Sequence, residues 1–339
     1  MSGLAAPLDA QDNEAGWGPQ RVDPQQPHGL PTGRLRPPLG QIDFPGPLAK
    51  RSLETVMRTI LLPIDFSIRS DRALRRASIL AKTSGSKLRL LHVVEGRVVD
   101  DQLVAGPRPP TTGQVRERLA GIADAIGEID GIKCESHVMS GDAVEQIAIA
   151  AKQSDTSLIV CGPHRRRLSD LITSSTAEAV AKRSKVPVLI ANALPEGGYN
   201  RILVSTGLDA ASAQILLTIN DLPTGGPHEL LAVHIREPLS TLMFDSSQQR
   251  EAYLCNELES AKQDLSDFLK RYRLGGHAQP HARLNRSTIG LELEESAAEL
   301  RCDVIAIASS QKDFLEKLVA GSVGEAVVRD VNLDVLIFP

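Results

Sequence analysis

Three segments of the chain occur twice in the same order, and this internal repeat constrains the fold more than any other feature. RTILLPID, which begins at Arg58, returns as RILVSTG from Arg201. LRLLHVVEG, through His92, returns as LLAVHIRE, through His234, and AEAVAKRSKVPVLI returns as GEAVVRDVNLDVLI. The repeated unit is about 140 residues long, which is the size of a domain rather than of a solenoid repeat. The sequence therefore predicts two related domains in tandem.

Each repeat alternates short apolar runs with amphipathic segments, which indicates alternating strands and helices. The apolar runs are rich in Val, Ile and Leu without polar alternation, as is typical of parallel strands that are covered on both faces. Right-handed crossovers then give an α/β fold: two tandem doubly wound, Rossmann-like domains, each with a five-stranded parallel sheet and a ligand crevice at the carboxyl ends of the strands. We expect strands near 58–64, 87–94, 132–138, 157–161 and 186–191, and again near 200–205, 229–235, 277–283, 303–307 and 333–338. We expect first-repeat helices near 69–83, 114–128, 142–152 and 174–184.

Residues 1–56 are rich in Pro, Gly and Gln and show no sustained helix or strand period. We expect this segment to be disordered, because it cannot bury enough apolar surface to offset the entropy of ordering. Two alternatives stay open: Met57 is a second candidate for the start of translation, and Trp17 is a candidate anchor for a partner. The predicted division is then a first domain at 57–193, a linker at 194–199 and a second domain at 200–339.

The composition is globular, with 42% hydrophobic and 24% charged residues and a formal net charge of −4. This balance gives no general attraction to nucleic acid or to an anionic membrane, so neither is expected as a partner. The sequence has neither an apolar run of about 18 residues nor a signal peptide, which favours a cytoplasmic location. The four cysteines are widely spaced without a CxxC pair, so we expect neither a disulfide nor a metal held by the protein alone.

The stretch GPHRRRLSDLITSST, residues 162–176, follows the apolar run SLIVC. A strand that ends in glycine and leads into a helix is a common phosphate site, because backbone N–H groups and the helix dipole face the anion there. Three arginines, 165–167, stand where such loops usually have glycine. They either bind phosphate oxygens directly or form a solvated basic loop. The solvated loop is favoured, because consecutive loop residues point in different directions.

These segments resemble the universal stress protein family across both repeats, residues 57–339. The resemblance rests on the strand and turn of RTILLPIDFSIRSDRAL, the strand LLHVVE, the segment VMSGDAVEQI and the closing AEAVAKRSKVPVLIA. None of these pieces is specific alone, but all of them occur in order. Single-domain relatives often dimerise through the last strand. The resemblance therefore implies that VPVLIAN and NLDVLIF pair within the chain, as an intramolecular pseudo-dimer that protects two edge strands and leaves further homo-oligomers open.

In nucleotide-binding members of the family, a carboxylate after the first strand contacts the ribose and adenine, and a small apolar residue on the second strand lines the base. A glycine-containing loop that ends in Gly-Ser or Gly-Thr holds the phosphates. The resemblance places these roles in the first domain on Asp65, Val93, Gly141, Gly162, Arg165, Ser174 and Ser175. Arg165 stands at the second loop glycine, and its interval to Ser174 is one residue short. Considered without the family, Asp65 is a turn or cap residue ahead of the next helix.

The second domain departs from the family pattern in different places. It retains an apolar wall residue and the phosphate-binding pair, at Ile235, Gly321 and Ser322. It lacks the carboxylate and three glycines, whose positions are taken by Gly207, Ser287, Ala308 and Gln311. Asp209 would replace the carboxylate only in part, because its side chain starts from a different place.

Each domain thus retains part of a nucleotide site, and neither retains the whole. The leading hypothesis is a non-catalytic cytoplasmic stress-response protein that binds small ligands or protein partners, with ATP binding weak or lost. One alternative is an ATP-binding sensor in the first domain, with Mg²⁺ held only together with the nucleotide and slow hydrolysis or self-phosphorylation as variants. Another is a second domain that binds a different anionic or apolar metabolite. No catalytic residue is predicted, because no nucleophile, base and orienting group converge in the sequence.

Overall fold

The computed structural model describes residues 58–95, 110–153, 155–162, 176–240, 244, 246–309 and 333–339. The strands of the first repeat are β1 (Thr59–Pro63), β2 (Lys87–Val94), β3 (Cys134–Ser140), β4 (Thr156–Cys161) and β5 (Val188–Ile190). Those of the second are β6 (Arg201–Ser205), β7 (Glu229–Arg236), β8 (Gln279–Leu284), β9 (Val304–Ala308) and β10 (Asp334–Phe338). The helices are α1 (Ile68–Ser84), α2 (Thr112–Asp130), α3 (Ala143–Gln153), α4 (Thr176–Arg183), α5 (Ala210–Thr218), α6 (Ser247–Arg271) and α7 (Ile289–Glu299). A short 3₁₀ helix, η2 (Ile219–Asp221), follows α5.

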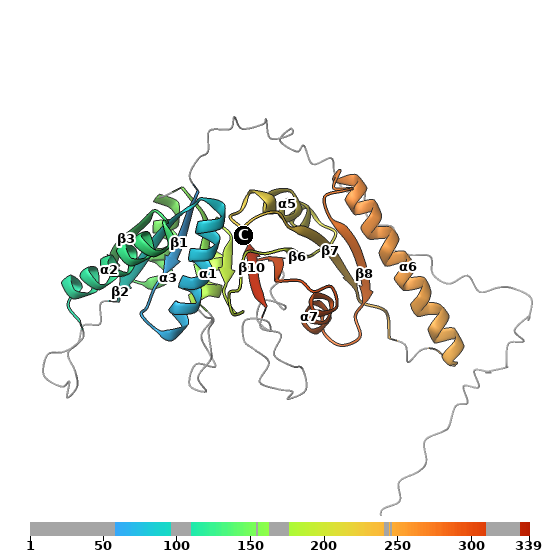
Figure 1. Cartoon of the computed structure of the whole chain (residues 1–339). Helices are drawn as coiled ribbons and strands as arrows, with labels where there is room; N and C mark the ends of the chain where they lie inside the picture. The colour runs from blue at the N-terminus through green and yellow to red at the C-terminus, as the bar shows by residue number, and fades with distance from the viewer. Residues whose placement is uncertain are drawn as a thin grey trace, which may run out of the picture. The chain divides into compact units, whose positions relative to one another are not determined.

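Within these residues the strands form one ten-stranded sheet, in the order β3-β2-β1-β4-β5-β10-β9-β6-β7-β8 (Figure 1). Neighbouring strands of the same repeat are parallel, as the apolar runs predicted. The two halves join where β5 and β10 pair in antiparallel fashion, with Ile190 opposite Val335 and Val188 opposite Ile337. The expected pairing of the two last strands is therefore observed, and it merges the two predicted sheets into one.

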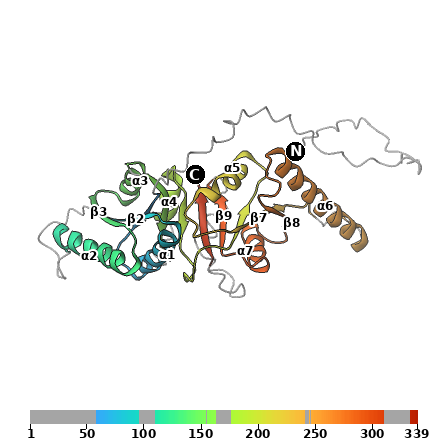
Figure 2. The ribbon, with the colours of Figure 1, turned by 45° about the horizontal axis from the view of Figure 1, so that its top comes forward.

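Helices cover both faces of the sheet, as a doubly wound fold requires. On one face, buried residues of α1, α2, α5 and α6 form an apolar core with alternate strand residues such as Ile60 and Ile202. On the other face, α3, α4 and α7 pack on the remaining strand residues, such as Leu61 and Leu203. Figure 2 shows α3 and α4 across the first-repeat strands from α1 and α2. Inner strands such as β1 and β9 are apolar on both sides because both sides are buried, whereas the edge strands β3 and β8 carry polar residues and are only partly buried.

Local signals in the sequence begin and end the helices. Ser67 caps α1 by accepting a hydrogen bond from the backbone of Ser70, and α1 ends at Gly85, which has a left-handed φ of 67°. Thr111 and Gln114 form a capping box at the start of α2. In the described part of the chain, no helix has the length and apolar character needed to cross a membrane.

Candidate functional site

A cavity of about 510 Å³ lies in the first domain at the carboxyl ends of β1, β2 and β4. This is where a doubly wound sheet holds its ligand, and the volume is that of a small-molecule site. The residues that matter to its chemistry are Asp65, Val93, Val115, Ile147, Gly162 and Thr176. They come from the loop after β1, from β2, α2 and α3, from the end of β4 and from the start of α4.

Asp65 stands at the tight turn between β1 and α1. Its Oδ1 accepts hydrogen bonds from the backbone N–H of Ser67, at 2.9 Å, and from the Ser70 hydroxyl. The turn is completed by Phe66, whose φ of 58° lies in the left-handed region. Burial raises the pKa of the Asp65 carboxyl, but the bonds from Ser67 and Ser70 outweigh burial and hold this pKa below its ordinary value. Asp65 is thus an ionised hydrogen-bond acceptor at the cavity. It also stabilises the turn before α1, the role that the sequence suggests when the family is left aside.

The strand β2 forms an apolar wall of the cavity. Val93 and Leu91 line it on the face that also carries Ile147 of α3. His92 points to the opposite face of the strand, and its Nδ1 lies 2.7 Å from the carbonyl oxygen of Ile64. Because a carbonyl only accepts, Nδ1 carries the proton, which ties β2 to the end of β1. His234 makes the same contact with the Thr206 carbonyl in the second domain, at 3.1 Å.

The two first-domain glycines of the expected site have different surroundings. Gly162 lines the cavity directly after β4, and Thr176, the first described residue of α4, lines it too. Gly141 links β3 to α3 with a φ of 136°, a conformation that favours glycine, and a Cβ there would lie 3.0 Å from Nε2 of Gln146. Gly141 is therefore required by the turn, and Ala143, two residues later, lines the cavity.

Five residues of the expected site lie outside the described part of the structure: Arg165, Ser174, Ser175, Gly321 and Ser322. They belong to the two segments in which the resemblance places the phosphate-binding residues. Their assignment stays a prediction from the sequence.

The second domain repeats the turn of the first with a different carboxylate. Leu208 has a φ of 61°, like Phe66, and the glycine before it replaces Asp65. Asp209 caps α5, and its Oδ1 accepts bonds from the backbone and hydroxyl of Ser212 at 2.8 and 2.6 Å. A Cβ at Gly207 would lie only 3.4 Å from Oδ2 of Asp209. The carboxylate thus reaches the space beside residue 207 although it starts two residues later.

The loop between β8 and α7 is longer than its first-domain counterpart. Asn285 donates its N–H to the carbonyl of Arg236 at 2.7 Å, as Gly141 does to Val94 at 3.1 Å. However, α3 begins two residues after Gly141, whereas α7 begins four residues after Asn285. Ser287, which the sequence aligns with Gly141, matches it only when counted back from the helix. Counted along the strand, the equivalent residue is Asn285. Ile235 lies on β7 opposite Arg283 and packs on the core at its edge.

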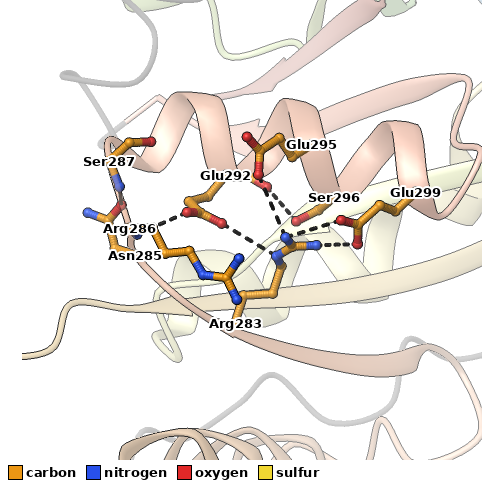
Figure 3. A network of polar contacts seen from close by, with 8 residues as sticks. All are labelled: Arg283, Asn285, Arg286, Ser287, Glu292, Glu295, Ser296 and Glu299. Carbon is orange, nitrogen blue, oxygen red and sulfur yellow. Dashed lines mark hydrogen bonds and ion pairs between the residues drawn. The ribbon is translucent and has the colours of Figure 1, made fainter. Parts of the chain in front are cut away.

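An ionic network that sequence reasoning missed holds this longer loop (Figure 3). The buried Glu292 accepts the backbone N–H of Arg286 at 2.9 Å, and its other oxygen lies 3.5 Å from Nε of Arg283. Arg283 also pairs with Glu295 and Glu299, further along α7. The signal was present in the sequence: glutamates at 292, 295 and 299 follow a helical spacing, which places them on one face.

Two tandem α/β domains, the first with a cavity at the carboxyl ends of its strands, define a protein of Rossmann-like architecture. Residues 57–192 and 198–339 each match the family model described as the Universal stress protein family, so the chain belongs to this family. The tandem relationship expected from the repeat is confirmed.

Known relatives match either most of this chain or a part of it that is about one domain long. A universal stress protein of Mycolicibacterium smegmatis is 21% identical over 296 residues, which cover 82% of this chain and 96% of the relative. Universal stress protein G of Salmonella typhimurium is 26% identical over 139 residues, 39% of this chain and 97% of the relative. Among solved structures, a universal stress protein from Archaeoglobus fulgidus aligns over 83% of this chain and 96% of its own, with a TM-score of 0.56 and 19% identity. That likeness shows a common fold.

Proposed function

We propose that the protein acts in the stress response of the cytoplasm by binding rather than by catalysis, and that its first domain binds an adenosine nucleotide. The observation that carries this proposal is the ionised Asp65 carboxylate at the edge of a cavity of about 510 Å³. A carboxylate accepts hydrogen bonds only, so it selects ligand groups that donate, such as ribose hydroxyls and an amino group.

The described walls of the cavity suit a nucleoside. Leu91, Val93 and Ile147 supply apolar surface for a flat base, and Asp65 lies beside them. Gly162 and Thr176 also line the cavity, and in the sequence they are joined by the loop that is predicted to hold phosphates. Because Arg165 replaces a glycine of the family's phosphate loop, we expect the β- and γ-phosphates to add little affinity. AMP and ATP with Mg²⁺ should then bind with similar strength.

Isothermal titration calorimetry with AMP and with ATP plus Mg²⁺ tests this proposal. Asp65→Asn keeps the shape of the side chain and removes its charge, so we expect AMP to bind about tenfold more weakly. Asp209→Asn is the matched control in the second domain and should leave this affinity unchanged. If the wild-type protein shows no saturable binding of either nucleotide below millimolar concentration, the nucleotide proposal is wrong. Phosphate release from ATP that depends on Asp65 would contradict the non-catalytic part.

We further propose that the second domain binds a different ligand, an anionic or apolar metabolite. This is supported by the different origin of its carboxylate, Asp209, and by the longer loop that Glu292 holds in place. Native mass spectrometry of the protein purified from cells tests it. A retained small molecule that survives Asp65→Asn would support a second-domain site, and a protein that carries no such molecule would count against it.

A further inference from the structure

The hydroxyl of Ser70 links the end of β1 to the carboxylate of Asp65. Ser70 lies in the first turn of α1 and is only 7% exposed. Its Oγ accepts the backbone N–H of Asp65 at 3.1 Å and donates its proton to Oδ1 of the same residue. One buried hydroxyl thus holds both the backbone and the side chain of Asp65. The backbone N–H of Ser67 and the hydroxyl of Ser70 both bond to Oδ1, and a hydrogen bond from the Ser67 side chain also helps to lower the pKa of this carboxyl.

The second domain contains an independent copy of this arrangement. Ser212 occupies the same place in α5 and is completely buried. Its Oγ accepts the backbone N–H of Gly207 at 3.0 Å and donates to Oδ1 of Asp209 at 2.6 Å. The carboxylate therefore comes from residue 209 in this domain rather than from the end of the strand, yet the serine still bonds it. Both turns contain the serine and its hydrogen bond to a carboxylate, but the residue that supplies the carboxylate differs between them.

We propose that Ser70 is a positioning residue of the first-domain site: its hydroxyl fixes the Asp65 carboxylate so that Oδ2 faces the hydroxyl and amino donors of the ligand. The ligand class rests on the proposed nucleotide function. The positioning role rests on the geometry around Asp65, and it is tested separately below. Ser70 also lines the cavity, but in this proposal it acts through Asp65 and not by binding the base.

Other ionisable groups lie around the cavity, and the experiment must separate their effects from that of Asp65. His92 of β2 and Glu95 directly after it line the same cavity, and the Arg118 guanidinium of α2 lies 4.6 Å from the centre of the Phe66 ring. A pH profile of ligand binding therefore mixes several groups. The carboxyl carbon of Asp65, followed by NMR in the ligand-free protein, reports on this one group.

The decisive variants are Ser70→Ala, Ser70→Thr and Ser212→Ala. Ser70→Ala removes a hydrogen bond to the ionised form of Asp65, so the NMR midpoint of Asp65 should move to higher pH. AMP should then bind about tenfold more weakly at neutral pH, and binding should be lost at a higher pH on acidification than in wild type. Ser70→Thr keeps the hydroxyl and should restore both properties. Ser212→Ala makes the same truncation at the equivalent buried place and should leave Asp65 and AMP affinity unchanged.

An unchanged Asp65 midpoint in Ser70→Ala would overturn the proposal, even if AMP binding weakened, because the serine would then act on stability alone. An equal effect of Ser212→Ala on AMP binding would overturn it as well. If wild type fails to bind AMP while Ser70→Ala still shifts the Asp65 midpoint, the nucleotide proposal fails and the positioning role stands.

Discussion

Nε of Arg76 lies 2.7 Å from Oδ2 of Asp334, and this buried ion pair joins the first domain to the second. Arg76 is on α1 and Asp334 begins β10, and neither is more than 4% exposed. The hydroxyl of Tyr199, in the connection between the domains, donates to Asp334 at 2.6 Å, and the Arg76 guanidinium lies 4.8 Å from the Tyr199 ring centre. Thr218 and Pro187 stand at the positions of the other repeat that correspond to Arg76 and Asp334. The ion pair therefore occurs at only one of the two equivalent places in the pseudo-dimer.

Truncating one partner of this pair should destabilise the protein strongly. Asp334→Ala leaves the Arg76 guanidinium buried without its counter-charge, which we expect to lower the free energy of unfolding by about 3–5 kcal/mol. Burial raises the pKa of Asp334 even though the charge of Arg76 and the hydroxyl of Tyr199 oppose the shift. The ionised pair is therefore costly to bury, and the double variant Arg76→Met with Asp334→Leu should recover most of the loss. Urea denaturation of Asp334→Ala and of the four proteins in the cycle of Arg76→Met and Asp334→Leu measures both effects. A loss under about 1 kcal/mol in Asp334→Ala would contradict the assignment.

The first domain shows which substitution can test the ionic network around Arg283 in the second domain. Met139 lies opposite Val93 as Arg283 lies opposite Ile235, so Arg283→Met introduces the residue of the other repeat. Glu292, which is 2% exposed, then loses its nearest cation, and we expect the free energy of unfolding to fall by about 1–3 kcal/mol.

Adding Glu292→Gln should restore most of that stability. Gln146 stands at this place in α3, counted from the helix start, and the amide oxygen of a glutamine can still accept the N–H of Arg286. Chemical denaturation of the single and double variants measures the recovery. If the double variant is no more stable than Arg283→Met, the buried charge is not the cause of the loss.

The thiols should differ sharply in reactivity, because the thiolate is the reactive form. Burial raises the pKa of Cys161 to about 12 and of Cys302 to about 11. Burial, with the charges of Glu135 and Asp124, raises the pKa of Cys134 to about 11. Cys255 is exposed on α6. An aromatic disulfide reagent at about pH 8 should label one thiol rapidly and the others only on unfolding, and Cys255→Ser should abolish the rapid phase. Rapid labelling of two or more thiols in the folded protein would contradict these environments.

The sequence predicted the strands and the position of Asp65 because both depend on neighbouring residues. An unbroken apolar run such as TILL specifies a strand buried on both faces, and the residue after it must lie at the carboxyl edge. The pairing of Arg76 with Asp334 could not be predicted in this way. Asp334 was visible as one acidic residue in an apolar run, but its partner lies on α1 of the other repeat, and no sequence period relates the two.

The second-domain site was hard to predict for a different reason. Aligning Gly207 with Asp65 marks the carboxylate as lost, because an alignment compares backbone positions. The sequence offers Asp209 only as a partial substitute, and the three-dimensional turn shows that its carboxylate reaches the space beside residue 207. The loop after β8 presents a similar difficulty. Counted from the strand, Asn285 corresponds to Gly141, but counted back from the helix, Ser287 does, so a sequence alignment cannot place the extra loop residues uniquely.

The connection between the domains packs so closely on the second domain that a single methyl group should disturb it. A Cβ on Gly198 would lie 2.6 Å from the carbonyl oxygen of Gly225, whereas a Cβ on Gly197 would meet nothing within 4 Å. Gly198→Ala should therefore lower the free energy of unfolding by about 1–3 kcal/mol, and Gly197→Ala, the matched control, should not.

The effect of Gly198→Ala should also reach the ion pair, since Tyr199 directly follows the displaced residue. Its N–H donates to the Thr224 carbonyl at 3.0 Å, and its hydroxyl holds Asp334. Moving this backbone pulls the hydroxyl away from the carboxylate, so the losses from Gly198→Ala and Tyr199→Phe should overlap rather than add. Denaturation of the two single variants and the double variant gives the coupling. Additive losses would mean that the close backbone contact and the buried ion pair stabilise the connection independently.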